Sequence, residues 1–235
     1  MGNVKLVRTR AQRDDAKPAR KTAVAEPASA RERILHAAEQ LFAEHGMSGV
    51  GLRAISAAAQ VNLASIAYHF GSKDGLLEAL FALRAAPIAE ARLRLLDEAE
   101  KRADGAPELE DILDAFIRPA LTMGSQQNGG PAFGRLRARL ATEPEALSRK
   151  ILSNAFDASS HRFIDAIAHA LPKLPRAEVE WRFHFMLGAM YYTMANSGRI
   201  QALTGGRCDP GDAKRALRHM IPFLAAGFRS PQRPA

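Results

Sequence analysis

Apolar side chains recur three and four residues apart over most of the chain, which is the spacing that places them on one face of an α-helix. The first stripe of this kind ends at Gly46 and consists of Ile34, Leu35, Ala38, Leu41 and Phe42. We find no alternation of apolar and polar residues typical of a half-buried strand, and no internal repeat. The pattern predicts an all-α protein.

Two short helices joined by a tight turn are expected over about residues 51–59 and 63–70. Asn62 precedes the second helix, where its side chain can accept a hydrogen bond from a free backbone amide and cap the helix. Ile66 and Phe70, four residues apart, face inward. Such a pair is the helix-turn-helix arrangement, whose second helix can enter the major groove of DNA.

Further signals mark the flanking helices. Ser29 and Glu32 have the spacing of a capping box, so the first helix is expected to begin there. Ser72 is expected to cap a helix that follows the helix-turn-helix unit. Pro87 falls within that helix and predicts a kink or break near residues 85–86.

The rest of the chain is also expected to be helical. Asp209 and Pro210 have the form of a cap followed by a first-turn proline, which would begin the last helix. A loop is expected at residues 125–130. The predicted helices are 108–123, 131–140, 143–171, 176–199 and 209–228. The resulting domains are a disordered basic tail (1–28), a helix-turn-helix domain (29–72), a helical effector-binding and dimerisation domain (73–229) and a disordered C-terminus (230–235).

The net charge of +8 and the pI near 10.0 fit a polyanionic partner, although a basic, solvated surface would give the same balance. Residues 1–30 hold seven Lys or Arg against three Asp or Glu, so half of the excess lies in the tail. That tail could follow the phosphate backbone of DNA. A solubilising extension or a wrongly chosen start codon would explain it equally well.

The segment from about Arg31 to Leu83 resembles the DNA-binding domain of the TetR (tetracycline-repressor-like) family of transcriptional regulators. The resemblance is densest in Val61-Asn62-Leu63-Ala64-Ser65 and in Tyr68-His69-Phe70-Gly71-Ser72-Lys73, which are closest to a subgroup that includes fatty-acid-responsive repressors. Gln60 stands where the family commonly has Gly, at a cost of about 1 kcal/mol if its backbone is left-handed. The resemblance implies the family's fold: a three-helix DNA-binding domain joined to a larger helical domain.

It also implies roles for residues of the DNA-binding domain. Tyr68 and His69 match positions that contact phosphates, although packing on neighbouring helices is the alternative for each. Ala67 stands where the subgroup often has a polar, base-reading residue. Because the recognition helix is poor in hydrogen-bonding side chains, we expect DNA shape and thymine methyl groups to matter more than usual in readout. The residues expected at DNA are Arg53, Asn62, Leu63, Ala64, Ser65, Ala67, Tyr68, His69 and Lys73.

In this family the central helices of the second domain line an effector cavity, which an ordinary packed core would resemble in sequence. Arg135, Arg137, Arg139 and His184 could meet a carboxylate or phosphate head group, or could be solvated. The residues expected to line the cavity are Phe116, Leu121, Met123, Phe133, Leu136, Phe156, Phe163, Trp181, Phe185, Met186 and Met190.

Residues 183–194 are apolar almost all round, as expected of a helix buried on more than one side. With the last helix they resemble the family's dimer interface, and a two-fold dimer would place two recognition helices on a palindromic DNA site. The residues expected at this interface are Leu187, Tyr191, Met194, Leu217, Met220, Ile221, Leu224 and Phe228.

Other chemistries lack a signature in the sequence. No metal-ligand spacing, phosphate-binding glycine loop or nucleophile motif is present, so neither an enzyme nor a metal or other cofactor is expected. No apolar run is long enough to span a bilayer, and no signal peptide opens the chain. The single Cys208 excludes an intrachain disulfide. We expect a cytoplasmic protein that has no membrane partner.

The leading hypothesis is a homodimeric repressor that binds a palindromic operator and is released by a small apolar effector. The subgroup resemblance favours an acyl chain or acyl-thioester, with an antibiotic-like or aromatic compound as the alternative. Two other functions stay open: a non-specific architectural DNA-binding protein, and a helical ligand-binding protein with a vestigial DNA domain.

Overall fold

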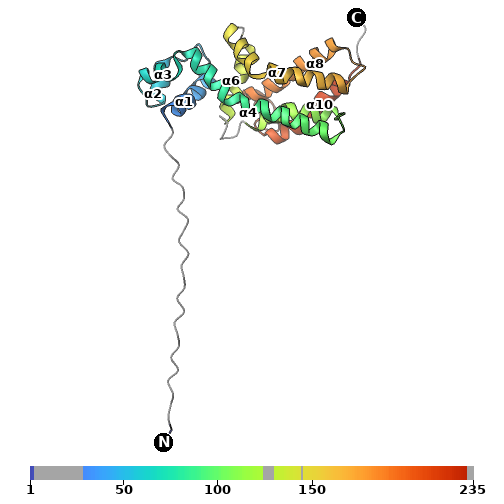
Figure 1. Ribbon diagram of the computed structural model, residues 1–235, viewed down its shortest axis with the longest axis horizontal. Coiled ribbons are helices and arrows are strands. Elements are labelled where there is room, and N and C mark those ends of the chain that lie inside the picture. Colours follow the sequence, from blue (N-terminus) through green and yellow to red (C-terminus); the bar gives the residue numbers. More distant parts are fainter. Residues whose placement is uncertain (3–28, 124–129, 144, 232–235) are drawn as a thin grey trace.

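The protein is described from a computed structural model that covers residues 1–2, 29–123, 130–143 and 145–231 (Figure 1). Within these residues the chain forms α-helices and no strand, which confirms the all-α prediction. The helices are α1 (Ala30–His45), α2 (Leu52–Ala58), α3 (Leu63–Phe70), α4 (Lys73–Arg102), α5 (Leu109–Thr122), α6 (Gly130–Thr142), α7 (Ala146–Ala170), α8 (Arg176–Ala195), α9 (Arg199–Thr204) and α10 (Ala213–Arg229).

Helices α1 to α3 form one end of the molecule, and α7, α8 and α10 lie toward the other end, with α4 and α6 connecting the two (Figure 1). The 30 residues of α4 reach from α3 to the far end, where α4 packs on α5 and α7. Helix α6 packs on α1 at one side and on α8 at the other. These two helices therefore connect the helix-turn-helix unit mechanically to the second domain.

Helices α1, α3 and α4 begin where the sequence predicts because capping side chains accept hydrogen bonds from their free amides. Ser29 and Glu32 form the complete capping box on α1. The Asn62 side chain accepts from the amide of Ser65 at 2.8 Å, and Ser72 accepts from Gly75 at the start of α4. Gln60 is left-handed, with φ at 53°, so the turn between α2 and α3 carries the expected backbone cost.

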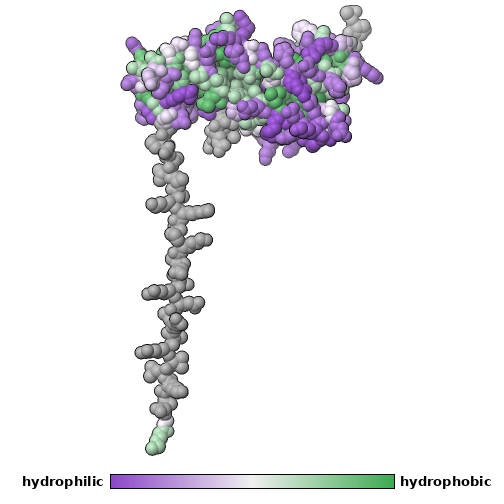
Figure 2. All heavy atoms as spheres, viewed as in Figure 1, coloured by the Kyte–Doolittle hydropathy of each residue, from purple (hydrophilic) through white to green (hydrophobic). Residues whose placement is uncertain are grey.

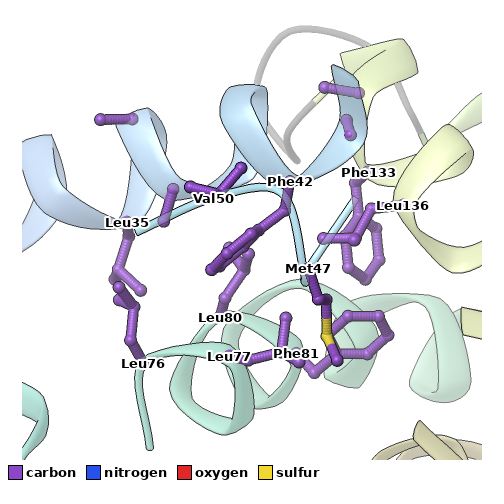
Figure 3. Close-up of a cluster of buried hydrophobic side chains, with 14 of the residues drawn as sticks. Leu35, Phe42, Met47, Val50, Leu76, Leu77, Leu80, Phe81, Phe133 and Leu136 are labelled. Carbon is purple, nitrogen blue, oxygen red and sulfur yellow. The ribbon is translucent and has the colours of Figure 1, made fainter. Parts of the chain in front are cut away.

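The apolar residues form two clusters. The N-terminal core lies between α1, α2, α3, α6 and the first parts of α4 and α7, and Figure 3 shows Phe42 pointing from α1 toward Leu80 of α4. The C-terminal core lies between α5, α8, α10 and the remaining parts of α4 and α7, around Phe116 and Phe163. Phe133 of α6 and Phe156 of α7 belong to the N-terminal core, although both come late in the sequence.

Several predicted boundaries need correction. Helix α4 continues through Pro87 without a break. Helix α8 ends at Ala195, and the left-handed backbone of the next residue, Asn196, turns the chain before the short α9. Asp212, and not Asp209, caps α10, because Asp209 bonds to the amide of Gly211 in the preceding turn. The expected loop at 125–130, apart from its last residue, and the tail at 3–28 lie outside the described residues.

Hydrophilic side chains cover much of the face seen in Figure 2, and apolar ones show among them in smaller patches. Among the described residues, no helix combines the length and the apolar character that crossing a bilayer requires.

Candidate DNA interface and effector region

The outer face of α3 is the candidate DNA-reading surface. Ile66, in the middle of this two-turn helix, is completely buried and anchors it to the N-terminal core. Tyr68 is 86% exposed, and His69 beside it is exposed as well. The alternative in which these two rings pack into neighbouring helices is therefore wrong for this subunit, although the rings touch each other edge-on. Leu63, Ala64 and Ala67 are also exposed.

Two polar residues at the start of α3 are used in its cap. The Ser65 hydroxyl donates to the Asn62 side chain at 2.9 Å, while the Asn62 oxygen also accepts from the Ser65 amide. This arrangement fixes the first turn of the helix and leaves Ser65 half-buried. Any contact that these residues make to DNA must coexist with, or replace, the cap.

The two cationic residues expected at DNA differ in how much of their side chains is exposed. Arg53, at the start of α2, is exposed. Lys73 is half-buried, and its ammonium donates to the carbonyl of Met47, so it ties the start of α4 to the connection between α1 and α2. A DNA-binding role for all nine residues of this surface stays a prediction.

The predicted cavity residues do not surround one chamber. Phe116, Phe163, Met186 and Met190 are buried in the C-terminal core, whereas Phe133, Leu136 and Phe156 are buried in the N-terminal core. Leu121 and Met123 are half-buried at the end of α5. Trp181 and Phe185 were wrongly expected inside: they are 60% and 62% exposed on α8, because the apolar stripe of this helix continues around to its outer face.

The predicted dimer residues fall into two groups that differ in how deeply they are buried within the subunit. Met194, Leu217, Leu224 and Phe228 are buried within the subunit's own C-terminal core, which leaves little of their surface for a partner and corrects that assignment. Leu187, Tyr191, Met220 and Ile221 are half-buried against the same core. The apolar side chains that are exposed there are Trp181, Phe185 and Tyr192 on α8 and Phe223 on α10.

Tyr192 and Phe223 of this group line an open hollow between α8, α9 and α10. The hollow has a volume of about 890 Å³, and Tyr192, Ile200, Met220 and Phe223 are among its lining residues. The Trp181 and Phe185 rings stack nearly parallel, with centroids 6.0 Å apart. Their spacing of four residues, with Tyr192 seven further on, was the sequence signal that could have identified this face.

The four basic residues proposed for a head group have four different environments. Arg135 is half-buried, His184 is exposed beside Trp181, and exposed Arg139 donates to the carbonyl of Glu44 at 3.0 Å, at the end of α1. Arg137 alone is buried, with 1% of its surface exposed.

Arg92 of α4 is equally buried and was missed in the sequence. It lies between Ile88 and Leu96, at a position in the apolar stripe where a charge is unexpected, and that interruption was the available signal. Burial, and secondarily the charge of Arg137, lowers the pKa of Arg92 to about 9. Burial also lowers the pKa of Arg137, and Tyr191 partly offsets this.

Comparison with known proteins assigns both parts of the chain. Residues 34–80 match the model of the bacterial regulatory proteins of the tetR family, and residues 114–227 match a tetracyclin repressor-like C-terminal domain. Together the two matches cover the helix-turn-helix unit and most of the second domain. Both describe transcriptional regulators rather than enzymes.

Individual relatives agree over the DNA-binding domain. The HTH-type transcriptional regulatory protein RaaS of Mycobacterium tuberculosis is 53% identical over 51 residues, which are 22% of this chain and 24% of that protein. The HTH-type transcriptional repressor AcnR of Corynebacterium glutamicum is 39% identical over 64 residues, or 27% of this chain and 34% of that protein. The chain thus matches only about a quarter to a third of the length of these curated relatives.

Solved structures share the whole fold. The fatty acid degradation regulator FadR from Bacillus halodurans superposes with a TM-score of 0.57 at 15% sequence identity, covering 88% of this chain and 100% of the other. At this identity the similarity establishes the architecture alone. The motif of α2 and α3, the two family matches and the shared fold lead to one conclusion: the chain belongs to the TetR family of bacterial transcriptional regulators.

Proposed function

We propose that the protein is a repressor that binds a palindromic operator as a homodimer and is released by a small effector with a large apolar part. The observation that carries the DNA-binding half is the outer face of α3, which presents Leu63, Ala64, Ala67, Tyr68 and His69 to solvent. Ile66 holds the opposite face of the helix, and the Asn62 cap fixes its first turn. At its other end the amide of Gly71 donates to the carbonyl of Ala67. A rigid helix with an unoccupied outer face suits insertion into the major groove.

In this proposal some side chains of the DNA-binding surface contact bases and others contact phosphates. Leu63, Ala64 and Ala67 are short apolar groups that can contact thymine methyls. Tyr68, His69 and Arg53 would contact phosphates and so set the position of the helix without reading sequence. We therefore expect Tyr68→Ala to weaken binding to all sequences by about 1–2 kcal/mol, and Leu63→Ser to change sequence preference instead.

Homodimer formation is supported by the exposed aromatic face of α8 and α10. Contiguous exposed apolar surface on a monomer commonly marks an interface. A two-fold axis through this face would pair identical α8 and α10 helices and set the two copies of α3 to read half-sites about 34–36 Å apart. Phe223→Arg is expected to yield monomers in sedimentation experiments, whereas Leu83→Arg, which changes an exposed apolar residue on α4, is expected to leave the dimer intact.

Effector release is supported by the connectivity of α6, which packs on α1 and on α8. An effector that binds better to one arrangement of these helices would shift the population toward it, and the same coupling would weaken operator binding. The apolar side chains on both sides of α6 favour an effector with an apolar body, and an acyl chain is the class that the motif resemblance favours.

The decisive test is selection of binding sites for the full-length protein from a pool of random DNA duplexes at near-physiological salt. Enrichment of an inverted repeat is the expected result. No enrichment, with equal affinity for all sequences and a steep loss of binding as salt rises, would refute the proposal and identify non-specific electrostatic binding. A protein that binds apolar ligands but no DNA would instead have a vestigial helix-turn-helix unit.

A further inference from the structure

The interior holds two arginines where the N-terminal and C-terminal cores meet, a place called the seam below. Arg92 reaches it from α4 and Arg137 from α6, and each has 1% of its surface exposed. Phe133 and Phe156 of the N-terminal core lie on one side, and Phe116 of the C-terminal core lies on the other.

Each guanidinium is surrounded by rings. The Arg92 guanidinium carbon lies 3.7 Å from the centroid of the Phe116 ring, and that of Arg137 lies 4.4 Å from the Phe156 ring. Phe156 is shared, because Arg92 lies 5.4 Å from the same centroid. Cation–π contacts reduce the free-energy cost of burying a positive charge but do not neutralise the charge.

The two arginines differ in their polar contacts. Arg92 donates from Nε to the carbonyl of Phe116 at 2.8 Å, and from Nη2 toward the sulfur of Met190 at 3.6 Å. Arg137 has no hydrogen-bond acceptor for Nε, Nη1 or Nη2 in the part of the chain that the structure describes. Tyr191 lies near it, with its ring centroid 5.8 Å from the guanidinium, but no Arg137 nitrogen meets hydrogen-bond geometry with its hydroxyl.

No ion pair joins either arginine to a carboxylate within the described ranges. Two like charges in an apolar interior with no counter-charge are costly, and buried charges in folded proteins are paired almost without exception. Five unsatisfied N–H groups on one guanidinium form a fork that matches a carboxylate or phosphate oxygen pair. An anion with two such oxygens would therefore supply both the counter-charge and the hydrogen-bond acceptors for Arg137.

We propose that the seam is the binding site for the anionic head group of an amphiphilic ligand, held by Arg137 and Arg92 with its apolar body among the surrounding phenylalanines. On the function proposed above, this ligand is the effector, so the inference names its class: an anion, carboxylate or phosphate, on an apolar body. A neutral apolar compound would leave both charges unpaired.

The position of the site also supplies a route to the DNA-binding unit. Arg137 and Arg139 are on the same helix, and Arg139 donates to the carbonyl of Glu44 at the end of α1. Leu136 and Leu140 of this helix pack in the N-terminal core beside α1. An anion that draws Arg137 toward Arg92 would act directly on the helix that supports α1.

The test is thermal unfolding of the full-length protein with four probes: decanoate, decyl phosphate, 1-decanol and acetate. The first two carry both an anion and a chain, 1-decanol carries the chain alone, and acetate carries the charge alone. We expect at least one of the two anionic amphiphiles to raise Tm with saturation, and 1-decanol and acetate to raise it much less.

The variant is Arg137→Met, which keeps an apolar stem and removes the charge, and its matched control is Arg135→Met, two residues away on the same helix. We expect half-saturation by the active amphiphile to shift by about 30-fold or more in Arg137→Met and to be unchanged in Arg135→Met. Arg137→Lys, which keeps the charge but not the fork, is expected to fall between the two.

Four results would overturn the proposal. Arg137→Met could respond like the wild type, 1-decanol could match the anions, or neither anion could stabilise the wild type. A variant Arg137→Met that fails to fold while Arg135→Met folds would make Arg137 a structural residue, which also overturns it. If anions bind through Arg137 but DNA selection enriches no site, the proposed repressor function fails and the anion site stands.

Discussion

Two regions of the described structure place arginine side chains in the interior, and they differ in what lies beside the positive charge. Between α1 and α4, Arg84 donates to one oxygen of the fully buried Glu39 at 2.9 and 3.2 Å. At the seam between the two cores, Arg92 and Arg137 are buried more deeply than Arg84 and have no carboxylate beside them in the described structure. One place has its counter-charge within the chain and the other does not.

This difference distinguishes an arginine that forms a structural ion pair from arginines that could bind a ligand. The Glu39–Arg84 pair joins α1 to α4, so it holds the helix-turn-helix unit against the long connecting helix. Burial raises the pKa of Glu39 even though Arg84 lowers it, so the pair is held at some cost. At the seam, burying the positive charges also costs free energy, but no carboxylate lies beside them to offset that cost. This is the physical reason for expecting an anionic ligand at the seam and not between α1 and α4.

Breaking the Glu39–Arg84 ion pair is expected to have the largest effect on stability. Arg84→Met leaves Glu39 charged and buried without its partner, and we expect a loss of about 3–5 kcal/mol in the free energy of unfolding, measured by urea denaturation at neutral pH. Arg94→Met, which removes one partner of the exposed Arg94–Glu98 pair, is the control and is expected to cost about 0.5 kcal/mol or less.

The loss in Arg84→Met should also depend on pH. Glu39 has a folded-state pKa above its ordinary value of 4.5, so the folded state holds a proton that the unfolded state has released, and stability falls as pH rises above 4.5. Without Arg84 the folded pKa rises further. The deficit relative to wild type should therefore be largest near pH 7–8 and shrink toward pH 5; a pH-independent deficit would contradict it.

Removing an unpaired buried charge should not lower the free energy of unfolding, in contrast to breaking the ion pair. Arg137→Met deletes a buried cation that has no hydrogen-bond partner in the described structure, so we expect stability without ligand to be unchanged or to rise by about 1–2 kcal/mol. The measurement is the same urea titration, read beside Arg84→Met. A loss as large as that of Arg84→Met would erase the distinction between the two places.

A smaller effect is expected where the seam helix meets α1. Arg139→Met removes the hydrogen bond to the carbonyl of Glu44 at the surface, so stability should fall by about 1 kcal/mol or less. If α6 couples effector binding to operator binding, the loss of operator affinity caused by the effector should be a few-fold smaller in Arg139→Met than in wild type. The affinity for the effector itself should be unchanged. Equal coupling in wild type and variant would exclude this contact as part of the route.

The smallest effect is expected from an exposed pair. Arg229 donates to both oxygens of Glu110, linking α10 to α5, and this hydrogen bonding lowers the pKa of Glu110. A lowered folded pKa gives stability that is present above the ordinary value of 4.5 and is lost as pH falls through the folded pKa. Both side chains are more than 40% exposed, so a double-mutant cycle with Glu110→Gln and Arg229→Met should give about 0.2–0.5 kcal/mol at pH 7 and nearly zero at pH 3.

Sequence reasoning was most accurate where structure is decided locally. The helix over residues 63–70 and the caps by Ser29, Asn62 and Ser72 were predicted as they occur, because a capping side chain and its amide are two or three residues apart. The last helix was predicted three residues early for the same kind of reason. Asp209 and Asp212 are both plausible caps, and only the fold of the preceding turn selects the second.

Assignments that depended on knowing which side of a helix faces the core were less accurate. Helix α8 is apolar nearly all round, so its sequence did not indicate which side faces the core. Trp181 and Phe185 were placed inside and lie outside, whereas Met194 was placed at an interface and lies in the core. The sequence also could not reveal that Phe133 and Phe156 would join the N-terminal core, because that depends on how distant helices pack.

By itself, the sequence determined the helical class, the helix-turn-helix unit and the exposed face of its second helix, since periodicity, caps and turns act within a few residues along the chain. The tertiary structure alone decided which apolar faces are shared between helices and that Arg92 and Arg137, forty-five positions apart, are buried at one seam. A buried charge is defined by what surrounds it in space, and its surroundings come from five helices whose mutual packing no local pattern encodes.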